Sequence, residues 1–311
     1  MRRRTRVITA GVAGVVALVA AIGVAAWFTA PRGTAIGARV AEHLRGTGGR
    51  AVPLAAVSRT LREAVVATED ERFYSHHGID LLGVLRVLPY DLVHLSFAQG
   101  GSTITEQVAK VLYLHGNDHS PWRKLEDAAL ALKLERRYDK EQILGAYLNT
   151  AYFGAGAYGV EAAARRYFGV RPGSLDLSQS SLLAGLIQAP SAYDPLRHPG
   201  AARDRQVEVL RSLVRTGVLT SGEAAAIAAR PLRLRLGSSL PGIRGVVFAV
   251  GPAFVWWELG VGLGALFIAA AVFVAARRLW PGPRRVLLLR ATSAAVVLLA
   301  VTVVIRSFRV A

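Results

Sequence analysis

The chain has 311 residues, of which 52% are hydrophobic, and its mean hydropathy of +0.35 is higher than that of an ordinary soluble domain. Its formal net charge is +17, yet the arginines are spread along the chain without a zinc-finger, RNP or basic-zipper pattern, which disfavours a nucleic-acid partner and favours an anionic membrane or lipid. The chain has no cysteine, so it must fold without disulfides.

Residues 1–30 are predicted to form a cytoplasmic tail and a transmembrane anchor. Arginines within Met1–Arg6 precede an uncharged apolar run, Val7–Phe28, which is close to the ~20 residues that a helix needs to cross a bilayer. The run is longer than the ~7 to 15-residue core of a cleaved signal peptide, which favours an uncleaved anchor. The arginines place the N-terminus in the cytoplasm, because positive charge is retained on that side.

Residues 31–240 are predicted to form a mostly α domain. Apolar residues recur at helical spacing over Leu54–Thr68 and over Leu125–Tyr138, and Lys140–Leu148 and Ser178–Ile187 are expected to be further helices. Strands do not alternate with crossover helices in this part of the sequence. We therefore expect a helical domain of a size that can bury its own core.

Residues 241–311 are predicted to contain two transmembrane helices, at about 246–276 and 286–305. The turn between them, Arg277–Arg285, is basic and belongs on the cytoplasmic side. Both basic signals agree on a multi-pass topology that places residues 31–240 on the extracytoplasmic face. The helical hairpin is expected to brace the domain against the bilayer or to bind a membrane partner.

The segment Thr68–Gly78 contains several acidic side chains and two histidines just after an apolar helical run. A carboxylate such as Glu69 could take a proton from a hydroxyl group if its surroundings kept its pKa within working range. A solvated helix end would give the same pattern. His76 and His77 are adjacent and lack a third ligand at a useful spacing, so we expect no metal site here.

The segment Gln99–Lys110 is rich in glycine and in neutral hydrogen-bonding groups. Its glycines let the backbone approach a ligand closely, its hydroxyl and amide groups add donors, and Lys110 adds a point charge, which together suit phosphate. The segment lacks the ending of a Walker loop. A capped helix start is an equally good interpretation of its hydroxyl groups.

A third cluster, Arg123–Asp127, places two cations one helical turn before an acidic pair. Such spacing is also typical of weak ion pairs on a helix surface. The order of the clusters along the chain is more specific than any of them alone. They read Glu69-Asp70-x-x-Phe73-x-x-His76-x-Gly78, then Gly100-Gly101-Ser102-Thr103-Ile104-Thr105-x-Gln107, then Arg123-Lys124 with Asp127, then Ile143-Leu144-x-x-Tyr147-Leu148-Asn149.

This order resembles the peptidoglycan glycosyltransferases of glycosyltransferase family 51, which include class A penicillin-binding proteins and monofunctional enzymes. The resemblance covers Leu54–Leu213. It implies a lysozyme-like α fold and the polymerisation of lipid II at the outer face of the bacterial cytoplasmic membrane. Glu69 would be the general base that deprotonates the 4-hydroxyl of the acceptor sugar. That hydroxyl would attack the anomeric carbon of the lipid-linked chain with inversion, and undecaprenyl pyrophosphate would leave.

The resemblance also assigns further site residues. Asp127 would be the second catalytic carboxylate, although the family has glutamate there, and Glu106 stands where the family has glutamine. A divalent cation such as Mg²⁺ could share the pyrophosphate, and no organic cofactor is expected. The substrate-binding residues carried over by the resemblance are Asp70, Ser102, Thr103, Gln107, Lys110, Arg123 and Lys124.

Three functions fit these observations. The first is lipid II polymerisation by a membrane-anchored enzyme without transpeptidase activity. The second is a catalytically weakened membrane scaffold that binds lipid-linked glycan or cell-wall synthesis proteins. The third is glycan cleavage, since a lysozyme-like fold can present a glutamic acid to a glycosidic bond. Cations suited to a diphosphate argue against cleavage, because a hydrolase holds no such leaving group.

Overall fold

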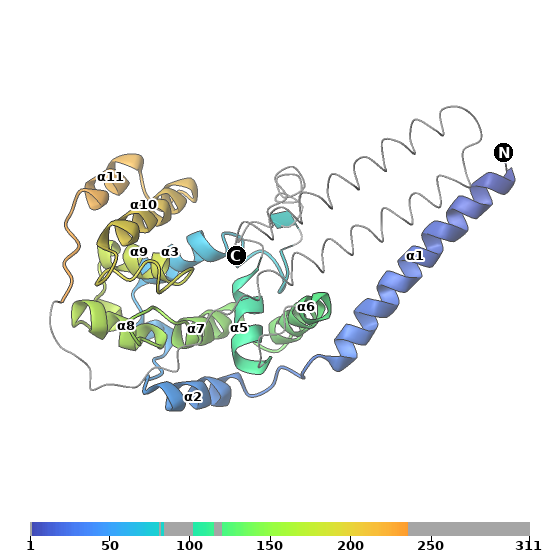
Figure 1. The fold of residues 1–311 in the computed structure, drawn as a ribbon, viewed down its shortest axis with the longest axis horizontal. Helices are drawn as coiled ribbons and strands as arrows, with labels where there is room; N and C mark the ends of the chain where they lie inside the picture. The colour runs from blue at the N-terminus through green and yellow to red at the C-terminus, as the bar shows by residue number, and fades with distance from the viewer. Residues whose placement is uncertain (1, 81, 84–101, 115–119, 236–311) are drawn as a thin grey trace, which may run out of the picture. The chain divides into compact units, whose positions relative to one another are not determined.

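The computed structural model describes residues 2–80, 82–83, 102–114 and 120–235 (Figure 1). The chain divides into two compact units. One contains Met1–Thr29, Gly116–Glu126 and Val247–Ala311, and the other contains Ala30–His115 and Asp127–Val246. The predicted C-terminal hairpin and the glycine pair of the second motif lie outside the described residues.

The described part of the first unit consists of helix α1, Arg2–Thr29, and the beginning of helix α6, Pro121–Glu135. Helix α1 contains the whole apolar run that the sequence predicts as an anchor. Within the described ranges, none of the helices meets the combined requirement of length and apolarity for a membrane crossing. The transmembrane anchor therefore stays a prediction.

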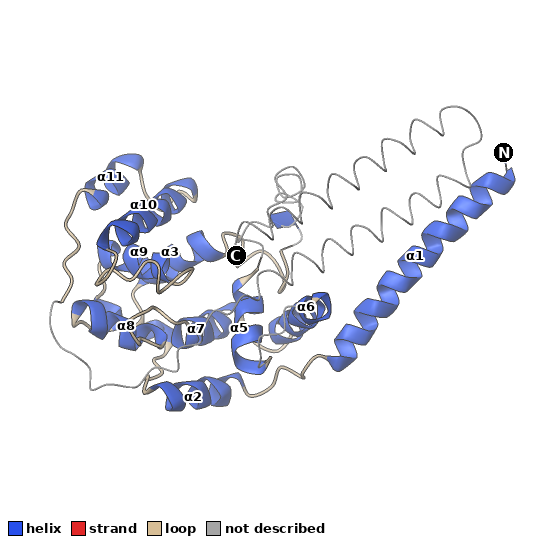
Figure 2. Ribbon diagram, viewed as in Figure 1, coloured by secondary structure: helices blue, strands red, loops and turns tan. Residues whose placement is uncertain are grey.

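The second unit is built from helices packed around a common core. Figure 2 shows helices and loops but no strand among the described residues, and a single antiparallel bridge, Tyr152 with Tyr158, is the only β pairing there. The prediction of a mostly α fold is thus confirmed. Besides the end of α6, the unit contains α2 (Ile36–Thr47), α3 (Arg59–Glu69), α5 (Ile104–Tyr113), α7 (Lys140–Thr150), α8 (Gly159–Phe168), α9 (Leu177–Leu186), α10 (Pro199–Arg215), α11 (Ser221–Ala228) and the short 3₁₀ turns Leu54–Ala56 and Pro172–Ser174.

The helix predicted over Leu54–Thr68 begins later than expected. Its first residues form a separate 3₁₀ turn, and α3 starts at Arg59 because Ser58 is extended and its hydroxyl caps the helix by accepting from the Leu61 N–H at 3.3 Å. Helices α5, α7 and α9 begin with capping boxes, in which the side chain of the N-cap residue and the side chain three residues later each accept a backbone N–H of the other residue. These local signals fix where the site-bearing helices start.

Two groups of helices share the core of this unit (Figure 1). Helix α3 packs with α9 and α10, and α11 closes that group, whereas α7 packs with α2, α5 and α8. Fully buried side chains fill both groups. They include Leu61, Leu182 and Leu183 in the first group and Ile104, Leu144, Leu148 and Tyr167 in the second. The two groups are connected at the end of α3, where Glu69 accepts hydrogen bonds from side chains of α5 and α7.

Candidate functional site

Glu69 is the last residue of α3 and is half-buried between the two helix groups. The side-chain amide of Gln107, on α5, donates to its Oε2 at 3.0 Å. The hydroxyl of Tyr147, on α7, lies 3.5 Å from the same oxygen and 3.1 Å from Oε1 of Gln107. The single proton of this hydroxyl can be donated to either oxygen, and the distance to Gln107 is the shorter of the two. Glu69 and the amide that holds it are therefore fixed by residues from three helices.

The groups around Glu69 change the pKa of its carboxyl in opposite directions. Burial raises the pKa of the Glu69 carboxyl above its ordinary value, because the charged form loses solvation, and the negative charge of Asp70 adds to the rise. The Gln107 hydrogen bond, the Arg205 charge and the Tyr147 hydroxyl oppose that rise in pKa. Burial also raises the pKa of Tyr147 well above its ordinary value, so its hydroxyl stays protonated as a donor. The net result is a carboxylate that gains affinity for a proton.

Asp70 is 7% exposed and holds the segment after α3 to the start of α5. Its Oδ2 accepts the Ile104 N–H at 3.0 Å, and both of its carboxylate oxygens lie 2.9 Å from Nε2 of His76. A carboxylate can only accept, so His76 carries its proton on Nε2. The sequence predicts that Asp70 contacts substrate, but its interior position suits a residue that supports the site.

Thr103 acts as the cap of α5. Its hydroxyl donates to the Gly78 carbonyl at 2.7 Å and accepts the Glu106 N–H at 3.1 Å, and the side chain is 2% exposed. Glu106, which replaces the family's glutamine, completes the capping box by accepting the Thr103 N–H at 2.8 Å. Glutamate serves this purpose as well as glutamine does. This departure from the family pattern thus has a structural role in the chain.

The other predicted site residues are distributed over α5 and α6. Ser102 is half-buried just before α5, and Lys110 is exposed in its last turn. Asp127 is 8% exposed in α6 and belongs to the same unit as Glu69. Arg123, which is half-buried, and Lys124, which is exposed, belong to the other unit. Substrate contact by these cations and a catalytic role for Asp127 remain predictions.

Arg205 is a site residue that the sequence analysis missed. It lies on α10, its side chain is 12% exposed, and its charge acts on Glu69. Its Nε donates to the Gly185 carbonyl at 3.4 Å, and its Nη1 lies 2.6 Å from the Glu208 carboxylate. Helix α10 contains several arginines, and the sequence does not show which of them lies near Glu69, because that depends on tertiary packing.

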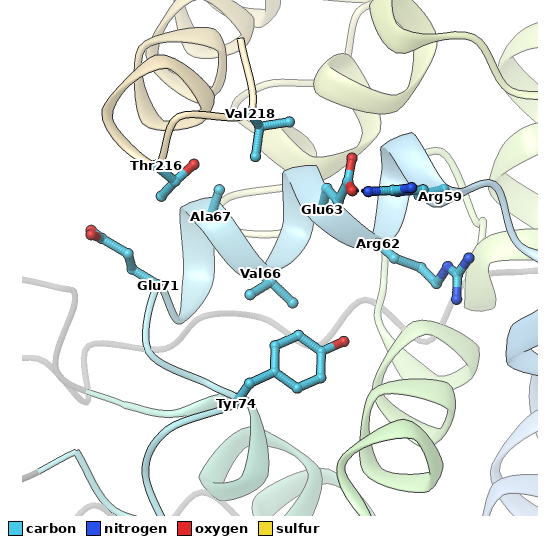
Figure 3. A pocket seen from close by; sticks show the side chains of 9 residues that line it. All are labelled: Arg59, Arg62, Glu63, Val66, Ala67, Glu71, Tyr74, Thr216 and Val218. Atoms are coloured by element: carbon cyan, nitrogen blue, oxygen red, sulfur yellow. Dashed lines mark hydrogen bonds and ion pairs between the residues drawn. The ribbon is translucent and has the colours of Figure 1, made fainter.

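A hollow of about 310 Å³ lies along α3 (Figure 3). Figure 3 shows the ion pair of Arg59 with Glu63 at its edge and the Tyr74 ring on the other side of Val66. The acid-rich segment contributes Glu71 and Tyr74 to the lining, but Glu69 is not part of it. Within the described ranges, no three His, Cys, Asp or Glu side chains converge to form a metal site. The described residues therefore offer no carboxylate cage for Mg²⁺.

Comparisons with known proteins agree with the motif pattern. A family model described as "Transglycosylase" matches residues 37–214, which is more than half of the chain. A protein of Cupriavidus necator, provisionally named a transglycosylase, is 45% identical over 186 residues, covering 59% of this chain and 79% of its own length. Penicillin-binding protein 1A of Aquifex aeolicus is 42% identical over 172 residues, covering 55% of this chain and 24% of its own length.

Penicillin-binding protein 1F of Bacillus subtilis is 38% identical over 180 residues, or 58% of this chain and 25% of that protein. The chain thus spans about a quarter of the two penicillin-binding proteins. The crystal structure of penicillin-binding protein 1A from Haemophilus influenzae is 23% identical, with a TM-score of 0.38, over 61% of this chain and 18% of that one. The match to the family model and the motifs at Glu69, Gln107 and Tyr147 agree: the chain belongs to the transglycosylase family, the peptidoglycan glycosyltransferases.

Proposed function

We propose that the chain polymerises lipid II into β-1,4 glycan strands with release of undecaprenyl pyrophosphate, and that Glu69 is the general base. The observation that carries this proposal is the difference in hydrogen bonding between the two oxygens of the Glu69 carboxylate. Its Oε2 is held by the Gln107 amide, whereas no hydrogen bond to Oε1 comes from the residues of the described ranges. Oε1 would accept the proton of the acceptor 4-hydroxyl as that oxygen attacks the anomeric carbon.

The raised pKa of Glu69 supports the same role. A base with a higher pKa takes a proton more readily, provided that it is still ionised at the working pH. The Gln107 hydrogen bond and the Arg205 charge oppose the rise in the pKa of Glu69, because both favour the ionised form. The fixed amide also sets the direction in which the carboxylate faces, so the base is oriented before the substrate binds.

The leaving group is a diphosphate, which gains negative charge as the glycosidic bond to it breaks. Lys110, Arg123 and Lys124 would stabilise that charge, because ammonium and guanidinium groups are the usual partners of phosphate oxygens. Asp127 would act as the second carboxylate of the reaction. A divalent cation such as Mg²⁺ would share the charge of the pyrophosphate with these cationic side chains.

We also propose that the enzyme works at the outer face of the cytoplasmic membrane as a multi-pass protein. The support is the uncharged run Val7–Phe28 with its preceding arginines, together with the two apolar runs at 246–276 and 286–305 and their basic turn. A lipid-linked substrate requires a catalytic site close to the bilayer surface. We expect the C-terminal runs to contact membrane or cell-wall synthesis proteins.

The test uses the purified full chain in detergent with lipid II. Formation of glycan polymer and undecaprenyl pyrophosphate supports the proposal. Binding of lipid II without turnover would instead support the scaffold, the alternative that the shorter carboxylate at Asp127 favours. Shortening of a preformed glycan strand would support cleavage and would contradict the polymerase.

A further inference from the structure

A chain of polar groups, buried except for a half-buried lysine, lies behind Glu69 and connects α6 to α3 and α5. Its members are Asp70, His76, Glu135, Thr105 and Lys140, all in the unit that contains Glu69. Proteins bury charged groups seldom, and mostly when those groups are paired. The proposed reaction uses none of these side chains directly except Asp70, and no simple packing requirement explains a cluster of this kind.

Glu135, the last residue of α6, lies at the centre of the cluster. Its side chain is 7% exposed, and its Oε1 accepts the Thr105 hydroxyl at 2.6 Å and the Lys140 ammonium at 2.6 Å. The same oxygen faces Nδ1 of His76 at 3.9 Å. His76 in turn donates from Nε2 to Asp70 at 2.9 Å, so the imidazole lies between two buried carboxylates.

Both ends of this network hold the first turn of α5. Asp70 accepts the N–H of Ile104, and Glu135 accepts the hydroxyl of Thr105, which is fully buried. Gln107, which donates to Glu69, lies two residues further along the same helix. A shift of the first turn of α5 would therefore change the distance between the Gln107 amide and the Glu69 carboxylate.

Lys140 and Phe73 secure the other side of the cluster. The Lys140 ammonium lies 4.5 Å from the centre of the Phe73 ring, which is fully buried, while it also pairs with Glu135. The His76 ring packs edge-on against the Phe73 ring with centroids 6.2 Å apart. The segment that follows Glu69 is thus fixed by Phe73, His76 and Lys140 together.

We propose that Glu135 is a positioning residue: by accepting the Thr105 hydroxyl it holds α5 against the end of α3, so that the Gln107 amide stays on Glu69. This inference rests on the proposed role of Glu69 as base. It extends that role to a residue distant from Glu69 in the sequence, at the opposite end of α6 from the cationic motif.

The experiment measures the titration midpoint of the Glu69 carboxylate in the full chain. The chain is labelled with ¹³C at glutamate side-chain carboxyl groups and studied by NMR in detergent micelles, and Glu69 is assigned from the signal that Glu69→Gln removes. The groups that face Glu69 are Asp70, Gln107, Tyr147 and Arg205, and each of them is left unchanged in the variants. Thr105→Val removes one hydroxyl with little change of shape, Thr105→Ser restores it, and Glu135→Gln removes the charge.

We expect the midpoint to rise by about half a pH unit or more in Thr105→Val and in Glu135→Gln, because a weaker Gln107 hydrogen bond favours the protonated form. It should keep its wild-type value in Thr105→Ser. Thr216→Val is the matched control. The Thr216 hydroxyl donates to backbone carbonyls of its own helix, so this variant also loses a donated hydrogen bond, but Thr216 lies outside the cluster. An unchanged midpoint in folded Thr105→Val and Glu135→Gln would overturn the proposal.

Rates with lipid II separate this inference from the proposed function. We expect kcat to fall about tenfold in Thr105→Val with KM unchanged, since positioning acts on the chemical step rather than on binding. A wild-type chain that made no polymer but showed the midpoint shifts would contradict the proposed function and leave the positioning role intact. An active wild type with unaltered midpoint and kcat in Thr105→Val would contradict the positioning role alone. If Glu135→Gln does not fold, Thr105→Val and Thr105→Ser still decide the question.

Discussion

The side-chain amide of Gln107 donates a hydrogen bond of 3.0 Å to Oε2 of Glu69. This bond joins α5 to the end of α3 and therefore joins the two helix groups that form the core of the larger unit. It also fixes one oxygen of the carboxylate and leaves the other for a substrate. Both the orientation of the proposed base and its proton affinity depend on this contact.

Glu69→Gln is expected to increase stability at neutral pH. The pKa of Glu69 is raised in the folded state, so its contribution to stability is present below the unfolded pKa and is lost as the pH rises through the folded pKa. The ionised carboxylate therefore destabilises the folded state at neutral pH, and glutamine removes this destabilisation. Thermal unfolding should show a higher Tm for the variant at about pH 7 and a smaller difference at about pH 4. A Tm of Glu69→Gln below that of the wild type at neutral pH would show that the hydrogen bonds and charges around the Glu69 carboxylate outweigh the effect of its burial.

Gly78→Ala is expected to disrupt the site more than an ordinary glycine substitution. Gly78 has φ +93°, and a Cβ there would lie 2.9 Å from the backbone of Ala131 in α6. Gly217 is the matched control, because it has φ +75° and nothing within 4 Å of such a Cβ. We expect Gly217→Ala to lose ~1 to 2 kcal/mol in the free energy of unfolding, which is the backbone cost alone. Gly78→Ala should lose clearly more, and equal losses in denaturant titrations would contradict this interpretation.

Asn149→Ala is expected to loosen the segment before α3. The Asn149 amide donates to the carbonyls of Val52 at 2.9 Å and Gly145 at 2.8 Å, and its Oδ1 accepts the Val52 N–H at 2.9 Å. Alanine leaves these partners without their bonds in a site where Asn149 is 5% exposed. The free energy of unfolding should fall by ~2 to 3 kcal/mol. A change within experimental error in urea denaturation would show that water replaces the amide without cost.

Asp127 tests how strictly the second carboxylate is required. If it takes part in the reaction, Asp127→Asn should lower kcat for lipid II polymerisation at least ~10-fold, because charge and proton affinity are lost at nearly constant shape. Asp127→Glu restores the family's side chain and should retain the wild-type rate or exceed it. Wild-type kcat in folded Asp127→Asn would remove Asp127 from the catalytic residues.

Much of this site could be predicted from the sequence, because its residues lie in motifs of fixed spacing. Glu69, Gln107 and Tyr147 belong to such motifs, and helices were predicted around Glu69 and Tyr147, whereas the helix that carries Gln107 was not predicted from periodicity. The capping role of Thr103 was one of two open interpretations, and only the tertiary contact with Gly78 shows where its hydroxyl proton goes. Motif spacing likewise does not reveal burial, so it could not show that the Asp70 carboxylate contacts Ile104 and His76, and the substrate contact of Asp70 stays a prediction.

Arg205 and Glu135 could not be found in this way. Each is one charged residue among many on a helix, and each gains its place only when helices that are distant in sequence pack together. The start of α3 at Arg59, by contrast, follows from a local signal, the Ser58 cap, that the apolar pattern alone obscured.

The central claim is that Glu69 is the base of a glycan-polymerising site. The most direct test compares the initial rate of polymer formation from lipid II by the full chain, by Glu69→Gln and by Glu71→Gln. Glu71 is an exposed carboxylate two residues away that pairs with Arg215 at 3.2 Å, so its variant controls for the loss of a nearby charge. We predict at least a ~100-fold loss of rate for Glu69→Gln and a wild-type rate for Glu71→Gln. A folded Glu69→Gln variant that polymerised lipid II at the wild-type rate would contradict the account.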